Sequence, residues 1–213
     1  AEGRADEINT CIACNQACLD HTFELKRASC LVNPRACHET ELVYLRTATP
    51  KKVAVVGAGP AGLACATVAA ERGHDVTLFD QAGEIGGQFN MATVIPGKEE
   101  YQQTIRYYGV MLKKHKVNVR LNTRATVEGL TGFDEVVIAT GVTPRKLDFP
   151  GIDHPKVLDY ADVLAAKKAV GKSVAIIGAG GIGFDVAEYL SHDFDHPSVS
   201  LNVEDYMKEW GVD

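Results

Sequence analysis

The chain has 213 residues, of which 46% are apolar and 23% charged, and its formal net charge is −6. This is the balance of a globular protein that can bury a sizeable core. A nucleic-acid partner is not expected, because binding a phosphate backbone needs clustered excess Lys and Arg. No apolar run approaches the roughly 20 residues that cross a bilayer, and the first residues lack the charged-then-apolar order of a signal peptide. We therefore expect no membrane partner and a cytoplasmic location.

Cysteines gather at the start of the chain, where five of the six lie within residues 1–45. Four of them follow the pattern C-x2-C-x3-C-x11-C, namely Cys11, Cys14, Cys18 and Cys30. In a reducing cytoplasm this pattern is not a disulfide framework, which leaves zinc or an iron–sulfur cluster. Zinc ribbons favour two C-x2-C knuckles, whereas a three-then-one grouping is commoner for a 4Fe–4S cubane with one thiolate at each corner. We favour the cluster and keep zinc as the alternative; Cys37 and His38 are interpreted as packing residues.

A glycine fingerprint opens a βαβ unit after Lys51. KKVAVVG is typical of a buried parallel strand, GAGPAG of a tight turn, LACATVAAERG of a helix ending at Gly73, and DVTLFD of a second strand. Gly57, Gly59 and Gly62 form G-x-G-x-x-G between strand and helix. Such a turn brings backbone N–H groups and a helix N-terminus against a pyrophosphate. The context predicts a doubly wound, Rossmann-like α/β dinucleotide-binding fold, preceded by the cysteine-rich linker.

The dinucleotide is predicted to be FAD. Asp80 ends the second strand, where a carboxylate can accept hydrogen bonds from an adenosine ribose and would repel a 2′-phosphate, so FAD or NAD is favoured over NADP. The later GGQ (residues 86–88) and ATG (residues 139–141) resemble the FAD domain of flavoproteins that have two dinucleotide folds. The alternative for Asp80 is a solvated carboxylate at the end of a strand.

Further segments continue the same fold. Tyr101, Ile105, Tyr108 and Leu112 recur at helical spacing, and VNVRLN and EVVIATG are typical of strands. Cys65 falls within the helix after the glycine turn, where we interpret it as a small buried hydrophobe rather than a redox group.

A second fingerprint contains Gly178, Gly180 and Gly183, within SVAIIGAGGIGFDVAEYL, which predicts another strand, turn and helix. Its position after an FAD fold indicates a pyridine-nucleotide site for the hydride donor. The residue that would choose between NADH and NADPH follows the next strand, which is not recognisable in the sequence. The alternative is that this turn completes the fold and binds nothing. The polar residues that follow are assigned no element.

Together these segments resemble one family. CIACNQACLD, SCLVNPRACHE, VVGAGPAGLA, FD, IGGQFN, IPGKEE, GIDHPKVL and AIIGAGGIGFD are similar, in this order, to the bacterial NADPH-dependent 2,4-dienoyl-CoA reductases, an iron–sulfur flavoprotein family that includes trimethylamine dehydrogenase. The resemblance covers nearly the whole chain. The gap between Cys14 and Cys18 favours the dienoyl-CoA branch, because trimethylamine dehydrogenase has one residue fewer there.

The resemblance implies a route for electrons. Members of the family carry an N-terminal (β/α)8 barrel with FMN, a linker with a 4Fe–4S cluster, and FAD and NADPH domains; electrons run from NADPH through FAD, the cluster and FMN to the dienoyl-CoA. This implies a cluster on Cys11, Cys14, Cys18 and Cys30, and FAD on the glycine turn with Ala61 and on Asp80, Gln88, Lys98 and Val127. Residues that protonate the substrate would belong to the barrel, so no catalytic residue is predicted.

We therefore expect three parts: an iron–sulfur linker at residues 1–45, an incomplete FAD-binding domain at 46–170 and the start of an NAD(P)-binding domain at 171–213. Both ends are expected to be truncations, and the piece alone to be inactive. The predicted function is the electron-relay part of an NADPH-dependent reductase of 2,4-dienoyl-CoA in the β-oxidation of unsaturated fatty acids. The alternatives are a related enoate or amine oxidoreductase, or a nucleotide-binding module stapled by zinc.

Overall fold

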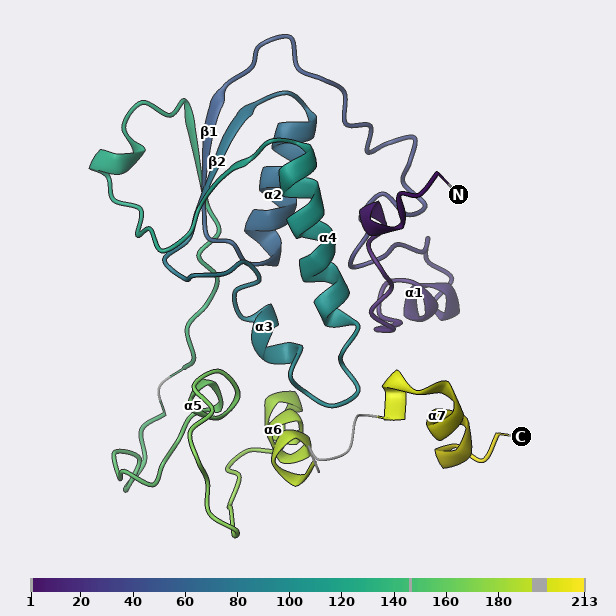
Figure 1. The fold of residues 1–213 in the computed structure, drawn as a ribbon, viewed down its shortest axis with the longest axis vertical. Helices are drawn as coiled ribbons and strands as arrows, with labels where there is room; N and C mark the ends of the chain where they lie inside the picture. The colour runs from purple at the N-terminus through teal and green to yellow at the C-terminus, as the bar shows by residue number, and fades with distance from the viewer. Residues whose placement is uncertain (1, 146, 193–198, 213) are drawn as a thin grey trace. The chain divides into compact units, whose positions relative to one another are not determined.

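The computed structural model describes residues 2–145, 147–192 and 199–212 (Figure 1). The chain divides into two compact units, one made of residues up to 89 together with 100–143, and the other of residues 90–99 together with 144 onward. Within the described ranges, no helix combines the length and the apolar character needed to cross a membrane.

A parallel four-stranded sheet forms the centre of the first unit, in the order β3-β2-β1-β4. The strands are β1 (Lys52–Val56), β2 (Asp75–Phe79), β3 (Asn118–Arg120) and β4 (Glu135–Ile138). Strand β1 lies inside the sheet, with β2 on one side and β4 on the other, so the strand order reverses at β1. This is the topological switch point of a doubly wound fold, and it confirms the predicted Rossmann-like α/β class.

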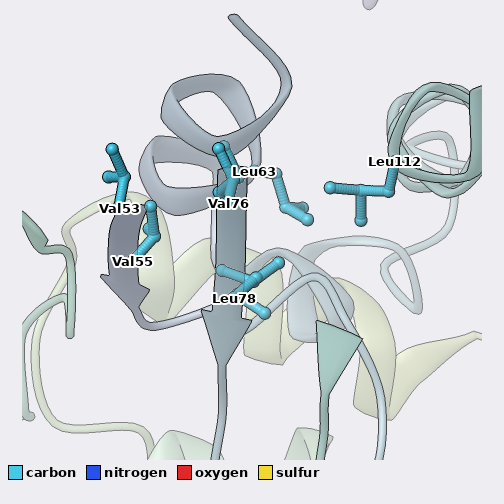
Figure 2. Close-up of a cluster of buried hydrophobic side chains, with 8 residues drawn as sticks. Val53, Val55, Leu63, Val76, Leu78 and Leu112 are labelled. Carbon is cyan, nitrogen blue, oxygen red and sulfur yellow. The ribbon is translucent and has the colours of Figure 1, made fainter. Parts of the chain in front are cut away.

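Two helices cover one face of this sheet, α2 (Pro60–Glu71) and α4 (Tyr101–Lys114) (Figure 1). Between them and the strands lies a core in which each labelled side chain is at most 7% exposed (Figure 2). Its members are Val53 and Val55 from β1, Val76 and Leu78 from β2, Leu63 from α2 and Leu112 from α4. Residues two apart on a strand share one face, which is why alternate residues of β1 and β2 meet the helices. The helical spacing that ends at Leu112 correctly predicted helix α4.

Helix α2 ends as its sequence predicts. Gly73 has φ +95° and donates its N–H to the Ala70 carbonyl, and the His74 N–H reaches the Ala69 carbonyl. This pair of bonds is a Schellman motif, which favours Gly because the residue is left-handed.

On the opposite face of the sheet, the loop between β3 and β4, which includes the short 3-10 helix η2 (Glu128–Leu130), packs against Phe79 of β2. The Phe133 ring meets the Phe79 ring edge to face, with centroids 5.9 Å apart, and the Arg120 guanidinium lies 5.6 Å from the Phe79 ring centre. Phe79 is consequently only 4% exposed.

The cysteine-rich segment, residues 2–45, has little regular structure. Its described residues form the 3-10 helix η1 (Ala5–Glu7) and the short helix α1 (Leu19–Phe23), and no strand. Several non-glycine residues take left-handed backbone angles, among them Ala13 and Asn15 between the first cysteines.

The second unit is helical among its described residues. It contains α5 (Tyr160–Leu164), α6 (Gly181–Ser191), η3 (Val199–Leu201) and α7 (Val203–Glu209), while α3 (Phe89–Ala92) spans the division between the units. Its buried cluster consists of Ile95, Val163, Leu164 and Val186. Helix α7 was not predicted, although Asn202 caps it by accepting the N–H groups of Glu204 and Asp205, an ordinary helix-start signal.

The predicted strand before the second fingerprint is wrong. Residues 173–177 form no strand, and no described strand lies alongside them to supply ladder hydrogen bonds. Ile177 is 73% exposed, in contrast to the buried residues of β1. An apolar run becomes a strand only where a neighbouring strand pairs with it, and that requirement is not visible in the run itself.

Candidate functional site

The glycine turn after β1 is held by contacts that leave no room for larger side chains. Gly57 has φ +110°, and a Cβ added to it would lie 2.2 Å from the Ala139 carbonyl oxygen after β4. A Cβ on Gly62 would lie 1.8 Å from the Gly57 carbonyl oxygen. Glycine is therefore required at Gly57 by conformation and packing, and at Gly62 by the close approach of helix α2 to the turn.

Gly59 lies on the open side of this turn. It is the N-cap of α2, no side chain caps the helix there, and a Cβ added to Gly59 would meet nothing within 4 Å. Pro60 occupies the next position and has no N–H, and Ala61 after it is exposed. The start of the helix thus has free N–H groups and a positive dipole end that no side chain caps, which fits a pyrophosphate.

Asp80 stands at the same edge of the sheet, directly after β2. One carboxylate oxygen accepts the Ala58 N–H at 2.6 Å and the other accepts the Ala82 N–H at 2.8 Å. Asp80 therefore joins the glycine turn to the loop after β2. Each oxygen has a second lone pair, so the carboxylate can also accept ribose hydroxyl groups. The bond to Ala58 was not foreseen from the sequence, because it depends on how the ends of β1 and β2 meet.

The GGQ segment runs beside the glycine turn. The Gly86 N–H donates to the Ala58 carbonyl at 2.8 Å, and a Cβ on Gly87 would lie 3.0 Å from the Gly59 Cα. Gln88 donates through Nε2 to the Val142 carbonyl, just after the ATG segment that follows β4. Val127, also of the first unit, is 82% exposed at the start of η2. The structure thus brings the GGQ and ATG segments to the glycine turn.

The second fingerprint repeats the local geometry of the first. Gly178 has φ +111°, Gly180 caps helix α6 with extended backbone angles, and a Cβ on Gly183 would lie 2.3 Å from the Gly178 carbonyl oxygen. The turn and helix of a dinucleotide site are present in the second unit without the strand that was expected before them.

Lys98 belongs to the second unit. Its Nζ lies 2.6 Å from Oδ1 of Asp185, in the first turns of α6, and each side chain is about a third exposed. Asp185 follows Gly183 by two residues, so the pair joins the segment 90–99 to the helix of the second fingerprint. The sequence singled out Lys98 without its partner.

The four cysteines of the C-x2-C-x3-C-x11-C pattern are free thiols, with Cys11 and Cys18 exposed and Cys14 and Cys30 partly exposed. Across the described residues, no three side chains of His, Cys, Asp or Glu are close enough together to hold a single metal ion. A cubane needs one thiolate at each of four corners, so its ligands stand farther apart than those of a single ion.

Backbone contacts join the two halves of the cysteine segment. The Ser29 N–H, beside Cys30, donates to the Ala17 carbonyl at 2.7 Å, beside Cys18. The Ala13 N–H donates to the Cys11 sulfur at 3.3 Å, a contact that stabilises a thiolate. The Nε of Arg35 is buried without a hydrogen-bond partner among the described residues, and its guanidinium lies 5.2 Å from the Tyr44 ring centre. The donor set and the N–H bond to sulfur fit an iron–sulfur cluster.

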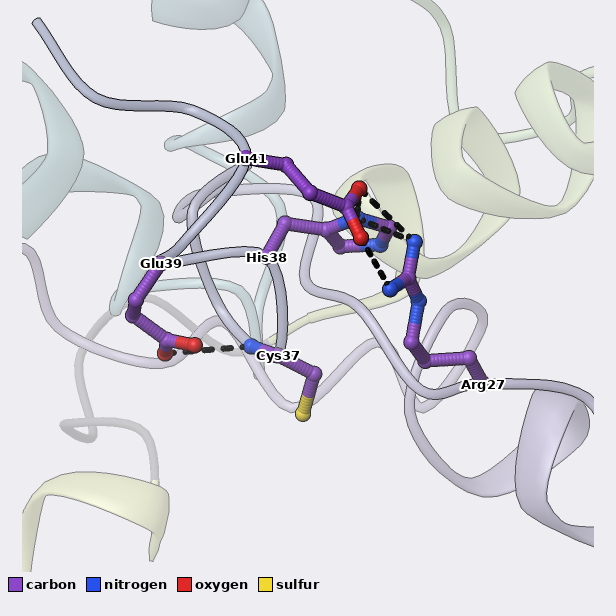
Figure 3. Close-up of polar contacts among 5 residues, drawn as sticks. All are labelled: Arg27, Cys37, His38, Glu39 and Glu41. Carbon is purple, nitrogen blue, oxygen red and sulfur yellow. Dashed lines mark hydrogen bonds and ion pairs between the residues drawn. The ribbon is translucent and has the colours of Figure 1, made fainter.

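A polar clasp closes the loop that carries Cys30 (Figure 3). Arg27 grips both oxygens of Glu41 with its guanidinium, and His38 Nδ1 lies 3.1 Å from Glu41 Oε2. These two neighbours lower the pKa of Glu41 to about 2. Cys37, between them in the loop, is exposed and left-handed, with φ +60°.

Cys65 packs beside the main core of the first unit. Burial raises the pKa of its thiol, which keeps it neutral and agrees with its interpretation as a small hydrophobe.

Most of the chain matches a known protein family. Residues 51–203 match the family described as pyridine nucleotide-disulphide oxidoreductase. The chain belongs to this oxidoreductase family. Its nucleotide-binding module is therefore of the FAD/NAD(P) type, as the glycine turn and the parallel sheet predicted.

Three similar proteins cover nearly all of the chain. It is 38% identical to a metal reductase of Desulforamulus reducens over 89% of its length and 37% identical to a cinnamate reductase of Clostridium sporogenes over 99%. A solved structure of 2-naphthoyl-CoA reductase with 2-naphthoyl-CoA superimposes with a TM-score of 0.85, at 35% identity over 99% of the chain. The chain spans 29%, 32% and 34% of these proteins, respectively.

Proposed function

We propose that this chain is the electron-relay part of an NADPH-dependent flavoprotein reductase, holding FAD and a 4Fe–4S cluster, and that the whole protein reduces 2,4-dienoyl-CoA in the β-oxidation of unsaturated fatty acids. The observation that carries the proposal is that one compact unit contains both a dinucleotide cradle and a four-cysteine segment. A flavin accepts a hydride and an iron–sulfur centre moves single electrons, so the combination serves a relay.

The residues proposed to hold FAD are those at the carboxyl edge of the sheet. The turn of Gly57, Gly59 and Gly62 would face the pyrophosphate with the backbone at Ala61, and Asp80 would accept the ribose hydroxyls. Gln88 lies at this turn through the GGQ segment. Bound FAD supplies the hydride-accepting ring, and these residues only bind and orient it.

The cluster is proposed on Cys11, Cys14, Cys18 and Cys30. The N–H bond to the Cys11 sulfur supports it, because such a donor stabilises negative charge on sulfur. The second fingerprint, Gly178 to Gly183, is proposed as part of an NADPH site in the second unit.

The substrate is proposed from chemistry shared with two relatives. Cinnamate and 2-naphthoyl-CoA, named in those proteins, are both conjugated carbonyl compounds, and the second is a CoA thioester. A 2,4-dienoyl-CoA combines these features. We place FMN and the groups that protonate the substrate in a barrel outside these 213 residues. A related protein with another electron acceptor is the second candidate, favoured by the 38% identity to a metal reductase.

The proposal is tested by the cofactors of anaerobically purified protein. We expect about four irons and four sulfides per chain, and release of FAD on denaturation. Cys30→Ser should lose the cluster, while Cys37→Ser, in the same loop, should keep it. Stoichiometric zinc without iron would contradict the relay, and release of FMN from this chain would contradict the assignment of its cradle to FAD.

A further inference from the structure

Arg106 on helix α4 donates hydrogen bonds both to the cysteine-rich segment and to a side chain of its own helix. Its Nη1 donates to the Asp6 carbonyl at 2.6 Å and its Nη2 to the Ile8 carbonyl at 2.8 Å, while Nε donates to Gln103 Oε1 at 2.7 Å. The two carbonyls belong to the end of η1 in the cysteine-rich segment, about a hundred residues away in the sequence. A forked, planar cation matches two adjacent carbonyls in a way that a lysine ammonium does not.

A second contact from α4 reaches the same short helix. Lys114 Nζ lies 2.6 Å from Glu7 Oε2, and this bond lowers the pKa of the Glu7 carboxyl. Helix α4 therefore contacts η1 in two ways: Arg106 binds carbonyls at the end of η1, and Lys114 binds the Glu7 side chain. Helices α4 and η1 both belong to the first unit, which also contains the glycine turn.

The contact continues toward the cysteines. Ile8 is followed by Asn9, whose Nδ2 donates to the Val32 carbonyl at 2.9 Å, and Cys11 comes two residues later. Val32 lies two residues after Cys30, so the arms that carry the first and the last cysteine of the pattern are joined next to the residues that Arg106 grips.

The other side of α4 is fixed in the nucleotide-binding core. Leu112 is 3% exposed and Tyr108 packs on the same cluster, which includes Ala58 of the glycine turn and Leu63 of α2 (Figure 2). One rigid helix is thus packed against the dinucleotide fold and hydrogen-bonded to the cysteine segment.

We propose that Arg106 is a positioning residue that docks the cysteine-rich segment on helix α4, and so fixes where the four cysteines lie relative to the dinucleotide cradle. The docking follows from Arg106 and its two carbonyls; its consequence for an iron–sulfur cluster rests on the proposed function. Electron transfer between two centres needs a fixed geometry, and a segment with so little regular structure has few other means of keeping one.

Hydrogen exchange in the purified, FAD-loaded protein tests the docking whether or not iron is present. In Arg106→Met, which keeps the stem and removes the donors, the Glu7 and Ile8 amides of η1 should exchange about tenfold faster, the loss expected when charge-assisted bonds are removed. Arg106→Lys should give an intermediate rate, because one ammonium reaches one carbonyl. The exposed Arg124, mutated to Met, is the matched control and should leave both amides unchanged.

Amides of β1 and α2 should keep their wild-type exchange in every variant, which separates local undocking from unfolding. If amide exchange in β1 and α2 also rises in Arg106→Met, that variant is destabilised as a whole, and the docking is then judged from Arg106→Lys. Wild-type exchange at Glu7 and Ile8 in both variants would overturn the inference. When the protein holds iron, Arg106→Met should also lose it to a chelator several-fold faster than Arg124→Met does. Absence of iron from the wild type would refute the proposed relay and leave the docking result standing.

Discussion

At the scale of single residues, Asp80 combines a structural contact with a proposed binding one. Its two oxygens accept the N–H groups of Ala58 and Ala82, and each keeps a lone pair that can accept a hydroxyl group of the proposed dinucleotide. A carboxylate at this position therefore shapes the glycine turn even before any ligand arrives.

Replacing Asp80 by Asn tests the proposed contact with the ribose. The amide keeps one acceptor oxygen and loses the charge, so FAD affinity should fall by about 1–3 kcal/mol, as when a buried hydroxyl loses its partner. The measurement is the FAD dissociation constant of the apoprotein. Asp75→Asn removes the same charge at the exposed start of β2 and should leave the affinity unchanged. Equal affinity of Asp80→Asn and wild type would show that the ribose is held elsewhere.

Gly59 and Gly62 separate binding from folding within one turn. A methyl group on Gly62 would collide with the Gly57 carbonyl oxygen, so Gly62→Ala should destabilise the apoprotein by about 1–3 kcal/mol or more. A methyl group on Gly59 meets open space, so the free energy of unfolding of Gly59→Ala should lie within about 0.5 kcal/mol of the wild-type value. The same variant should bind FAD more weakly, because the methyl group occupies the approach of the pyrophosphate. Thermal melting and FAD titration of both variants measure this. The same profile for both would contradict it.

At the scale of elements, the cysteine-rich segment is organised by polar contacts rather than by a core. Residues 2–45 contain one buried hydrophobic side chain among the described residues, that of Ala17, 9% exposed. Their order depends on the Arg27–Glu41 clasp, on Ser29 with Ala17, and on the grip of α4 at η1. Such a segment is expected to loosen when the charged groups of these contacts are neutralised.

The contact of Glu41 with Arg27 and His38 should weaken in acid. Arg27 and His38 lower the pKa of Glu41 from its ordinary 4.5 to about 2, so their attraction is complete above about pH 4.5 and is lost as the pH falls toward 2. An NMR titration of the Glu41 carboxyl carbon should show a midpoint near 2 in the wild type. In Arg27→Gln it should return toward 4.5, because the largest cause of the shift is removed. A wild-type midpoint already near 4.5 would show that the clasp is open in solution.

At the scale of the whole molecule, the chain spans about a third of the proteins it resembles. The second unit holds the turn and helix of a fingerprint without a described strand before them. Hydride transfer needs a nicotinamide held against a flavin ring, which calls for a complete nucleotide site on each side.

We therefore expect these 213 residues, loaded with FAD and cluster, to store electrons but not to reduce a dienoyl-CoA. Dithionite should bleach both centres, since each needs only electrons, whereas NADPH should reduce the flavin slowly or not at all. An anaerobic stopped-flow comparison with the whole protein, followed by addition of 2,4-dienoyl-CoA, measures both steps. Turnover of the acyl-CoA by this chain alone would place the active site within it, and would contradict the proposal that the active site lies in a separate barrel.

The sequence by itself determined what depends on neighbours in the chain. The glycine turn, the end of α2 at Gly73, the strand pattern of β1 and β2 and the spacing of the four cysteines are all local or periodic, and the first three are confirmed as geometry. Local geometry also explains why Gly178 and Gly183 repeat the first turn without any strand beside them.

The tertiary structure decided which distant groups meet. Three sets of contacts join residues that no sequence periodicity relates: Asp80 with Ala58, Lys98 with Asp185, and Arg106 with the carbonyls of Asp6 and Ile8. The failed strand at 173–177 has the same cause, because an apolar run pairs only when another strand lies beside it. Hydrogen bonds and ion pairs between distant segments depend on where the folded backbone places them, and only the assembled chain contains that information.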